Sequence, residues 1–165
     1  MGTRNLTKVI DSTGRTRVAQ YGQWDGYPSY TGTRILDFIT ERGNLERIQT
    51  NLKKVHFITD DEVDSFYEGF TDGDSFESVY PTLSRNTGCD ILRVIAYSSG
   101  FTLPLVDNSE FENDELFCEG VYTLNYETRE FVSVYGDKTI KFSFDQLPTA
   151  DEYLRSFEKD LTIAA

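Results

Sequence analysis

The chain has 165 residues, a formal net charge of −12, and an aromatic content of 14%. A chain of this length can bury the core of one domain, so we expect residues 1–165 to form a single α+β domain. The sequence has no run of about 18 apolar residues, which argues against a membrane-spanning helix, and we expect no signal peptide because an apolar segment does not follow its start.

The charge is distributed unevenly along the chain. Residues 1–55 carry a net charge of +4, residues 56–119 a net charge of −13, and residues 120–165 a net charge of −3. The acidic middle third repels nucleic acid, so we expect no general DNA or RNA binding. Such an acidic surface either meets a basic partner or is simply solvated.

The first third of the sequence predicts a hairpin and two helices. Residues 4–10 and 16–23 are rich in Val, Ile and Thr and flank a turn that contains glycine, which is typical of two paired strands. Residues 24–32 hold the turn signals Asp-Gly and Tyr-Pro and predict a loop. Apolar residues within 35–39 fit one helix, and those within 45–55 fit a second helix that Asn44 would cap.

The middle of the sequence predicts further helices. Thr59 and Glu62 have the spacing of a capping box, and the apolar stripe that follows, 63–70, predicts a helix with an acidic outer side. A similar stripe recurs over 76–83, where Pro81 should break or kink the helix. Apolar residues within 91–95 predict another helix, which Gly100 would stop.

The final third changes to the period of a strand. Residues 101–105 alternate, with Pro104 indicating an edge strand, and 116–126, 130–135 and 139–144 predict an antiparallel meander. A last helix begins at Thr149, with a second capping box to Glu152. The order predicts an α+β fold with an N-terminal β-hairpin, a helical middle, a C-terminal antiparallel β-meander and a final helix, its strands mostly antiparallel.

The motifs of several common chemistries are missing. His56 is the only histidine and the two cysteines, Cys89 and Cys118, are 29 residues apart, so we expect two free thiols in a cytoplasmic protein and no zinc site. The sequence has no EF-hand, no nucleotide-binding glycine motif and no nucleophile elbow. We therefore assign no catalytic residue, metal or cofactor.

The stretch 18–32, VAQYGQWDGYPSYTG, concentrates planar and polar side chains. Its rings can stack on a flat ligand or on a partner's arginine, its glutamines offer donors and acceptors, and its carboxylate lies beside Gly26, where we expect a left-handed turn. Arg4 of the neighbouring strand would neutralise that carboxylate or grip an anion. The candidate binding residues are Arg4, Gln20, Gln23, Trp24, Asp25, Tyr27 and Tyr30. The competing interpretation is structural, with the rings filling the core and the carboxylate capping the turn.

An acidic segment is the second candidate surface. Residues 60–77 contain eight acidic residues and no basic residue. We expect seven of these acids to form a face for a basic partner: Asp60, Asp61, Glu62, Asp64, Glu68, Asp72 and Asp74.

Three stretches together resemble a known family. These are Gly2-Thr3-Arg4, the motif QYGQWDGYP at 20–28, and the C-terminal pattern LFCEGVYTLN, FVSVYG and FDQLP. The chain resembles a family of small uncharacterised proteins from bacteria and their phages. The resemblance implies a bacterial cytosolic setting on phage or mobile DNA, and by analogy an action on host machinery or immune signals.

Three functional hypotheses remain open at this point. The first is a non-enzymatic binding protein, such as a phage-type inhibitor of host defence, whose target is either a host protein with a basic surface or a small nucleotide-like ligand. The second is a small hydrolase or transferase, which requires Asp25 in a concave pocket beside other polar groups. The third is a structural domain without a ligand.

Overall fold

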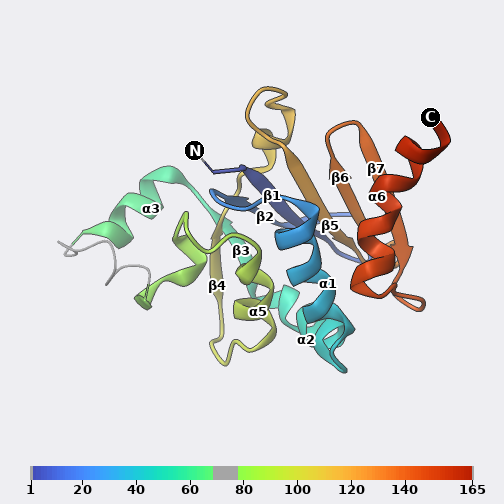
Figure 1. The fold of residues 1–165 in the computed structure, drawn as a ribbon. Coiled ribbons are helices and arrows are strands. Elements are labelled where there is room, and N and C mark those ends of the chain that lie inside the picture. Colours follow the sequence, from blue (N-terminus) through green and yellow to red (C-terminus); the bar gives the residue numbers. More distant parts are fainter. Residues whose placement is uncertain (1, 69–77, 165) are drawn as a thin grey trace.

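A five-stranded sheet organises the fold. The computed structural model describes residues 2–68 and 78–164, with side chains up to residue 158. The sheet has the order β2-β1-β5-β6-β7 and is antiparallel except between β1 and β5, which are parallel (Figure 1). Its strands are β1 (Asn5–Ile10), β2 (Thr16–Gly22), β5 (Gly120–Asn125), β6 (Glu130–Tyr135) and β7 (Lys138–Ser143).

The β1–β2 hairpin is closed by one aspartate. The Asp11 carboxylate accepts hydrogen bonds from the Thr13 amide, the Thr13 hydroxyl and the Arg15 amide at 2.9, 2.6 and 3.1 Å. Gly14 has a φ of +88°, which a turn of this kind assigns to glycine. The hydrogen bond from the Thr13 hydroxyl is the main reason that the pKa of Asp11 lies below its usual value.

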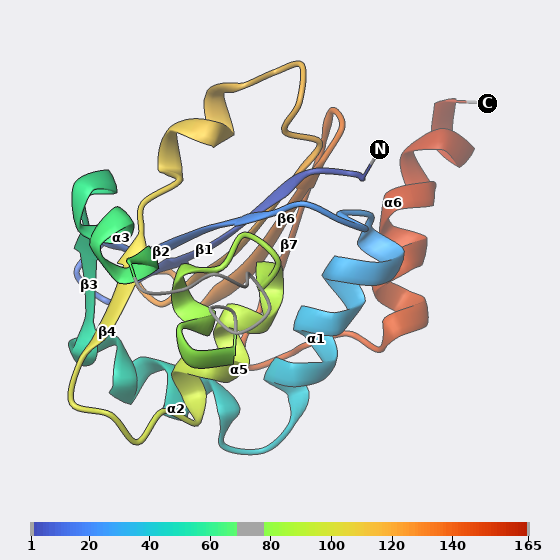
Figure 2. The same cartoon turned by 90° about the vertical axis from the view of Figure 1, so that its left-hand side faces the viewer.

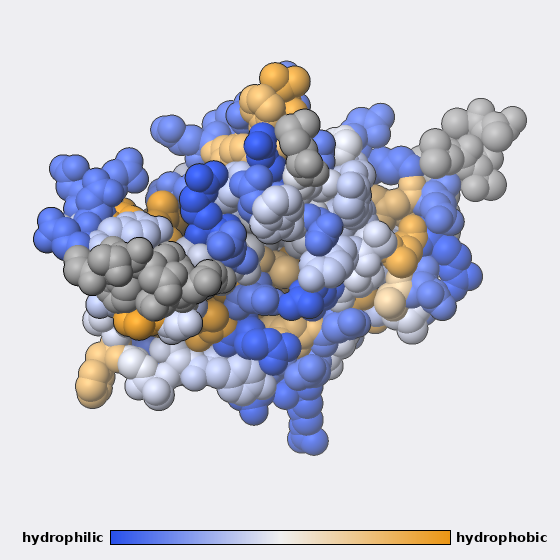
Figure 3. Space-filling view, turned by 60° about the vertical axis from the view of Figure 1, so that its left-hand side comes forward, coloured by the Kyte–Doolittle hydropathy of each residue, from blue (hydrophilic) through white to orange (hydrophobic). Residues whose placement is uncertain are grey.

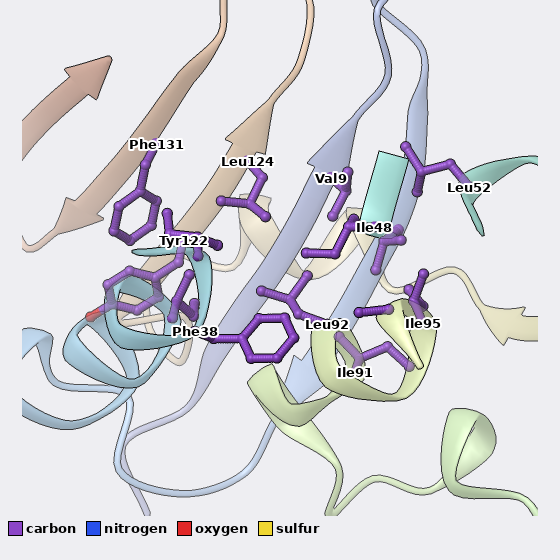
Figure 4. Close-up of a cluster of buried hydrophobic side chains, with 14 of the residues drawn as sticks. Val9, Phe38, Ile48, Leu52, Ile91, Leu92, Ile95, Tyr122, Leu124 and Phe131 are labelled. Carbon is purple, nitrogen blue, oxygen red and sulfur yellow. The ribbon is translucent and has the colours of Figure 1, made fainter. Parts of the chain in front are cut away.

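Four helices cover one face of the sheet. They are α1 (Thr33–Thr40), α2 (Asn44–Asn51), α5 (Ile91–Ala96) and α6 (Ala150–Ala164). Figure 4 shows apolar side chains of α1, α2 and α5, among them Phe38, Ile48 and Leu92, packed against Val9 and Leu124 of the strands. Burial of this large apolar cluster is the main stabilising contribution to the fold.

The final helix is fixed to the sheet by Tyr153. Its ring stacks on Phe131 with 5.7 Å between ring centroids, and its hydroxyl donates a 2.7 Å hydrogen bond to the Ser133 hydroxyl. Gly32, just before α1, makes room for this ring, because a Cβ at that position would lie 2.3 Å from the Tyr153 hydroxyl oxygen.

The opposite face of the β1, β2 and β5 strands carries a smaller cluster of Leu6, Ala19 and Val121. The segment 107–119, which contains the 3₁₀ helix η5 (Ser109–Asn113), runs over this side of the sheet (Figure 2). Lys8 forms an ion pair with Glu112 at 3.0 Å, and the Asn108 amide donates to the Ala19 carbonyl at 2.9 Å.

A second, two-stranded sheet lies beside β2. It pairs β3 (Val55–Ile58) with β4 (Leu103–Val106) in parallel. Arg17 on β2 joins the two sheets, because its guanidinium donates to the Leu52 and Val55 carbonyls at 2.9 and 3.0 Å. Helix α3 (Asp60–Tyr67) follows β3.

The predicted α+β class is confirmed: strands begin the chain, helices fill its middle, and a β-meander and a helix end it. The capping box at Thr59 is complete, and at Thr149 the side chain of the first residue accepts the expected amide. The Glu62 amide donates to the Thr59 hydroxyl at 3.2 Å, and the Glu152 amide donates to the Thr149 hydroxyl at 3.2 Å. These helix starts depend on local spacing alone, which is why the sequence predicts them well. Part of the predicted stripes, 69–77, lies outside the described residues.

The prediction for the second helix was wrong at both ends. Gly43, at φ +88°, is the residue before the helix, and Asn44 is its buried first residue. The side-chain amide of Asn44 donates to the Phe38 carbonyl at 2.8 Å and does not cap the start of the helix. The helix ends at Asn51, and Val55 begins a strand because its backbone pairs with β4. The helix 91–96 likewise ends before the predicted Gly100.

The loop and meander predictions also need correction. Within the predicted loop 24–32, Pro28–Gly32 forms a π-helical turn. The predicted strand 116–126 begins only at Gly120, because the Asp114 carboxylate accepts the amides of Leu116 and Phe117 at 3.2 and 3.0 Å and so forms a turn. Two of the strand pairings are parallel, which a pattern of local alternation does not reveal.

Candidate functional site: an aromatic–acidic cleft

A cleft of about 280 Å³ opens at the end of β2. One wall comes from the segment 22–34, the other from the segment 86–90 before α5, and Asn5 of β1 contributes between them. We call it the aromatic–acidic cleft. It is lined by Asn5, Gly22, Gln23, Trp24, Asp25, Tyr30, Thr31, Arg34, Asn86, Thr87, Gly88, Cys89 and Asp90.

Buried hydrogen bonds fix the backbone of the first wall. The Gly26 amide donates to the Thr3 carbonyl at 2.9 Å, and the Tyr122 hydroxyl donates to the Gly26 carbonyl at 2.6 Å. The Thr31 hydroxyl donates to the Asp25 carbonyl at 2.7 Å. The left-handed residue of this turn is Asp25, with a φ of +49°, and not Gly26 as the sequence predicted. Aspartate is one of the residues that tolerate this conformation.

The rings of this wall are exposed and do not fill the core. Trp24 is 57% exposed and Tyr30 is 46% exposed, and both line the cleft. Tyr27 is equally exposed but lies outside the cleft, with its ring centroid 6.3 Å from that of Tyr135. The structural interpretation, in which these rings seal the interior, is therefore wrong.

Arg34 is the only cationic residue in the lining, and it is already paired. Its guanidinium contacts the Asp90 carboxylate at 2.7 Å and lies over the Tyr30 ring, 5.3 Å from the ring centroid. The hydrogen bond with Asp90 raises the pKa of the Arg34 guanidinium. Asp25, in contrast, is exposed, and no residue that the structure describes forms an ion pair with its carboxylate.

Asn5 supplies a buried acceptor. Its side-chain Nδ2 donates to the carbonyls of Thr3, Gly22 and Trp24, each at 3.3 Å. These three carbonyls determine which end of the amide is the nitrogen. Its Oδ1 accepts no hydrogen bond from the described part of the chain, although Asn5 is only 1% exposed. A buried amide oxygen without a donor is unfavourable by about 1–3 kcal/mol.

Cys89 contributes the one thiol of the lining. Its thiol is half-buried, and burial raises the pKa of this thiol. The thiolate is the reactive form, so this environment suppresses nucleophilic attack at neutral pH. The single histidine, His56, does not line the cleft.

Three of the seven predicted binding residues lie outside the cleft: Tyr27, Arg4 and Gln20. Arg4 does not pair with Asp25; its guanidinium lies over the Phe117 ring, 5.1 Å from the centroid. Gln20 is buried and donates from Nε2 to the Ser84 carbonyl at 3.2 Å. Gln23 does line the cleft and accepts a hydrogen bond from the Tyr21 hydroxyl. The cleft thus unites Gln23, Trp24, Asp25 and Tyr30 and leaves out Arg4, Gln20 and Tyr27.

No family model, curated protein or solved structure matches this chain.

The acidic face is exposed over the residues that can be described. Asp60, Asp61, Glu62, Asp64 and Glu68 are all exposed on and beside α3, whereas Asp72 and Asp74 lie outside the described residues. Glu62 is engaged in the capping box. On the face in Figure 3, hydrophilic residues separate small groups of apolar atoms, and no broad apolar patch is visible outside the grey region.

Among the side chains that the structure describes, those of residues 2–68 and 78–158, no cluster of three or more is able to hold a metal ion. Over residues 2–68 and 78–164, no helix has the length and apolar character needed to cross a membrane.

Sequence reasoning missed Asn5, Arg34 and the segment 86–90. Asn5 lies within a strand pattern, and nothing in that pattern separates it from an ordinary buried polar residue. The segment 86–90 lies about 60 positions after Trp24 in the chain, and its contacts with β1 and β2 bring it to the cleft. Gly88, at φ +52°, is close to Gly22 across this junction.

Proposed function

We propose that this chain is a non-enzymatic binding protein that holds another molecule in the aromatic–acidic cleft. The observation that supports this most strongly is the exposed Trp24 ring beside the unpaired Asp25 carboxylate, on a backbone that buried hydrogen bonds hold in place. A large exposed ring on a fixed backbone is a feature of binding sites, because little conformational entropy is lost when a ligand stacks on it.

The chemistry of the lining favours binding over catalysis. The cleft contains no histidine, and its one thiol is held in the protonated form by burial. The hydrolase or transferase alternative keeps one supporting observation, because Asp25 lies in a concave site beside Gln23, Asn86 and Thr87. Asp25 would act as its general base.

The expected partners are a host protein with a basic surface or a small nucleotide-like ligand. A bacterial cytosolic setting and an action against host defence follow from the family resemblance alone and stay predictions. The exposed acids of α3 provide a second surface for a basic protein, and binding through them would weaken steeply with salt because exposed charges are screened.

Trp24 is the only tryptophan of the chain, so its fluorescence reports on the cleft alone. We would titrate the protein with arginine- and lysine-containing peptides and with nucleoside monophosphates, recording Trp24 emission and the melting temperature. We expect at least one probe to change the Trp24 emission and to raise the melting temperature. Asp25→Ala should abolish both effects. Trp24→Ala, for which only the melting temperature can be recorded, should abolish the rise in melting temperature. The proposal fails if no probe has either effect.

A further inference from the structure

The charge and hydrogen-bonding groups of the cleft indicate the chemistry of the group it binds; this inference rests on the proposed binding function. We infer that the cleft takes a guanidinium group, as arginine carries, which stacks on Trp24 and pairs with the Asp25 carboxylate.

The cleft already contains one example of this arrangement. The Arg34 guanidinium lies 5.3 Å from the centroid of the Tyr30 ring and 2.7 Å from an oxygen of the Asp90 carboxylate. An aromatic face and a carboxylate together satisfy both the flat face and the N–H edge of a guanidinium. Trp24 and Asp25 supply a second ring and a second carboxylate to the same cleft, and no cation from the described residues pairs with this carboxylate.

The lining carries a net negative charge and one buried acceptor that lacks a donor. Its two carboxylates, Asp25 and Asp90, exceed its one cation, Arg34, so its formal charge is −1. Asn5 adds a buried Oδ1 that accepts no hydrogen bond within the described chain. A group that brings N–H donors and a positive charge complements both features, and a guanidinium carries five such donors in one plane.

The same features disfavour the phosphate of a nucleotide. The one guanidinium that could hold a phosphate is paired with Asp90, and the exposed Asp25 would repel the anion. An ammonium group fits less well than a guanidinium, because it is a compact and strongly hydrated charge that cannot stack as a plane.

The test uses small probes that differ in one property. N-acetyl-arginine amide is titrated into the full chain while Trp24 emission is recorded, and N-acetyl-citrulline amide provides the same planar shape without the charge. N-acetyl-lysine amide supplies charge without the plane, and AMP supplies a base with a phosphate. We expect the arginine compound to bind at least about tenfold more tightly than the other three.

The decisive variant is Asp25→Asn. Asparagine tolerates the left-handed backbone at this position as well as aspartate does, so the variant removes charge without straining the loop. We expect it to weaken binding of the arginine compound about tenfold or more. Asp137→Asn, which makes the same change at an exposed acid of the β6–β7 turn, outside the cleft and outside the acidic face, should leave binding within about twofold.

The outcomes separate this inference from the function on which it rests. Tighter binding of AMP or of the citrulline compound than of the arginine compound would overturn the guanidinium inference and leave the binding function standing. If no probe changes Trp24 emission, both fall. An arginine-containing peptide that binds more tightly than the isolated arginine amide identifies the source as a polypeptide, and equal affinities identify a free guanidinium compound; either result supports the inference.

Discussion

Asn5→Asp is the substitution that most sharply tests how the cleft is built. The two side chains have nearly the same shape, but the change replaces the Nδ2 donor with an oxygen. The two N–H groups of Nδ2, which the Thr3, Gly22 and Trp24 carbonyls share, would be lost together. At about 1 kcal/mol net for each N–H, this loss destabilises the fold by about 2 kcal/mol.

The pH dependence adds a second, independent readout. A buried carboxylate facing three carbonyl oxygens is unfavourable when ionised, so its pKa in the folded state rises above the unfolded value. The variant therefore loses further stability as the pH rises above the usual pKa of aspartate, and regains some as the carboxyl group becomes protonated. The deficit relative to the wild type should be larger at pH 7 than at pH 4.5.

Urea denaturation followed by circular dichroism measures this deficit at both pH values. The control is Asn113→Asp, which makes the same change at an exposed residue of η5. Asn51→Asp is unsuitable because the Asn51 side chain also donates a buried hydrogen bond, to the Ile95 carbonyl. A deficit for Asn5→Asp below about 1 kcal/mol at pH 7, or one that does not change with pH, would refute the role given to Asn5.

Three further substitutions test neighbouring features. Gly32→Ala would bring a Cβ to 2.3 Å from the Tyr153 hydroxyl oxygen, so it should lower the free energy of unfolding by about 2 kcal/mol in urea denaturation, and adding Tyr153→Phe should recover part of that loss. Asp25→Val should lower the free energy of unfolding by about 1–2 kcal/mol because a β-branched residue is strained at φ +49°. An unchanged melting temperature for this variant would count against the left-handed turn. Asp11 stabilises the folded chain above its usual pKa of 3.8, and this contribution is lost as the pH falls through its lowered folded-state pKa. In urea titrations, the stability difference between the wild type and Asp11→Asn should therefore shrink as the pH falls from 6 to 2.5. A difference that grows on acidification would contradict this role of the Asp11 carboxylate.

The parts of the fold that depend on neighbours in sequence could be predicted. The β1–β2 hairpin follows from β-branched strands around a turn in which Asp11 accepts amides two and four residues later. The caps at the starts of α3 and α6 follow from residues three apart. In each case the interaction is local, so its signal lies within a short stretch of sequence.

The parts that depend on distant contacts could not be predicted. The segment Val55–Ile58 has the apolar content of a helix end, and only its pairing with β4, almost 50 residues later, makes it a strand. The parallel pairing of β1 with β5 joins residues more than 100 positions apart. Local sequence patterns do not predict such distant pairing partners.

The candidate site shows the same distinction between residues that are close in sequence and residues brought together by distant contacts. The sequence marked Gln23, Trp24, Asp25 and Tyr30 as a group because they are close together in the chain, and all four line the cleft. Arg4 was placed beside Asp25 because its strand is adjacent, yet its guanidinium lies over the Phe117 ring. That ring comes from a turn more than 100 residues away, which sequence alone does not bring to Arg4.

Acrylamide quenching of Trp24 fluorescence is the most direct test of the claim that this ring is a surface for another molecule. The emission of the only tryptophan should be quenched readily in the free protein, and N-acetyl-arginine amide at saturating concentration should protect it. Emission that is already shielded from acrylamide in the free protein would contradict the account.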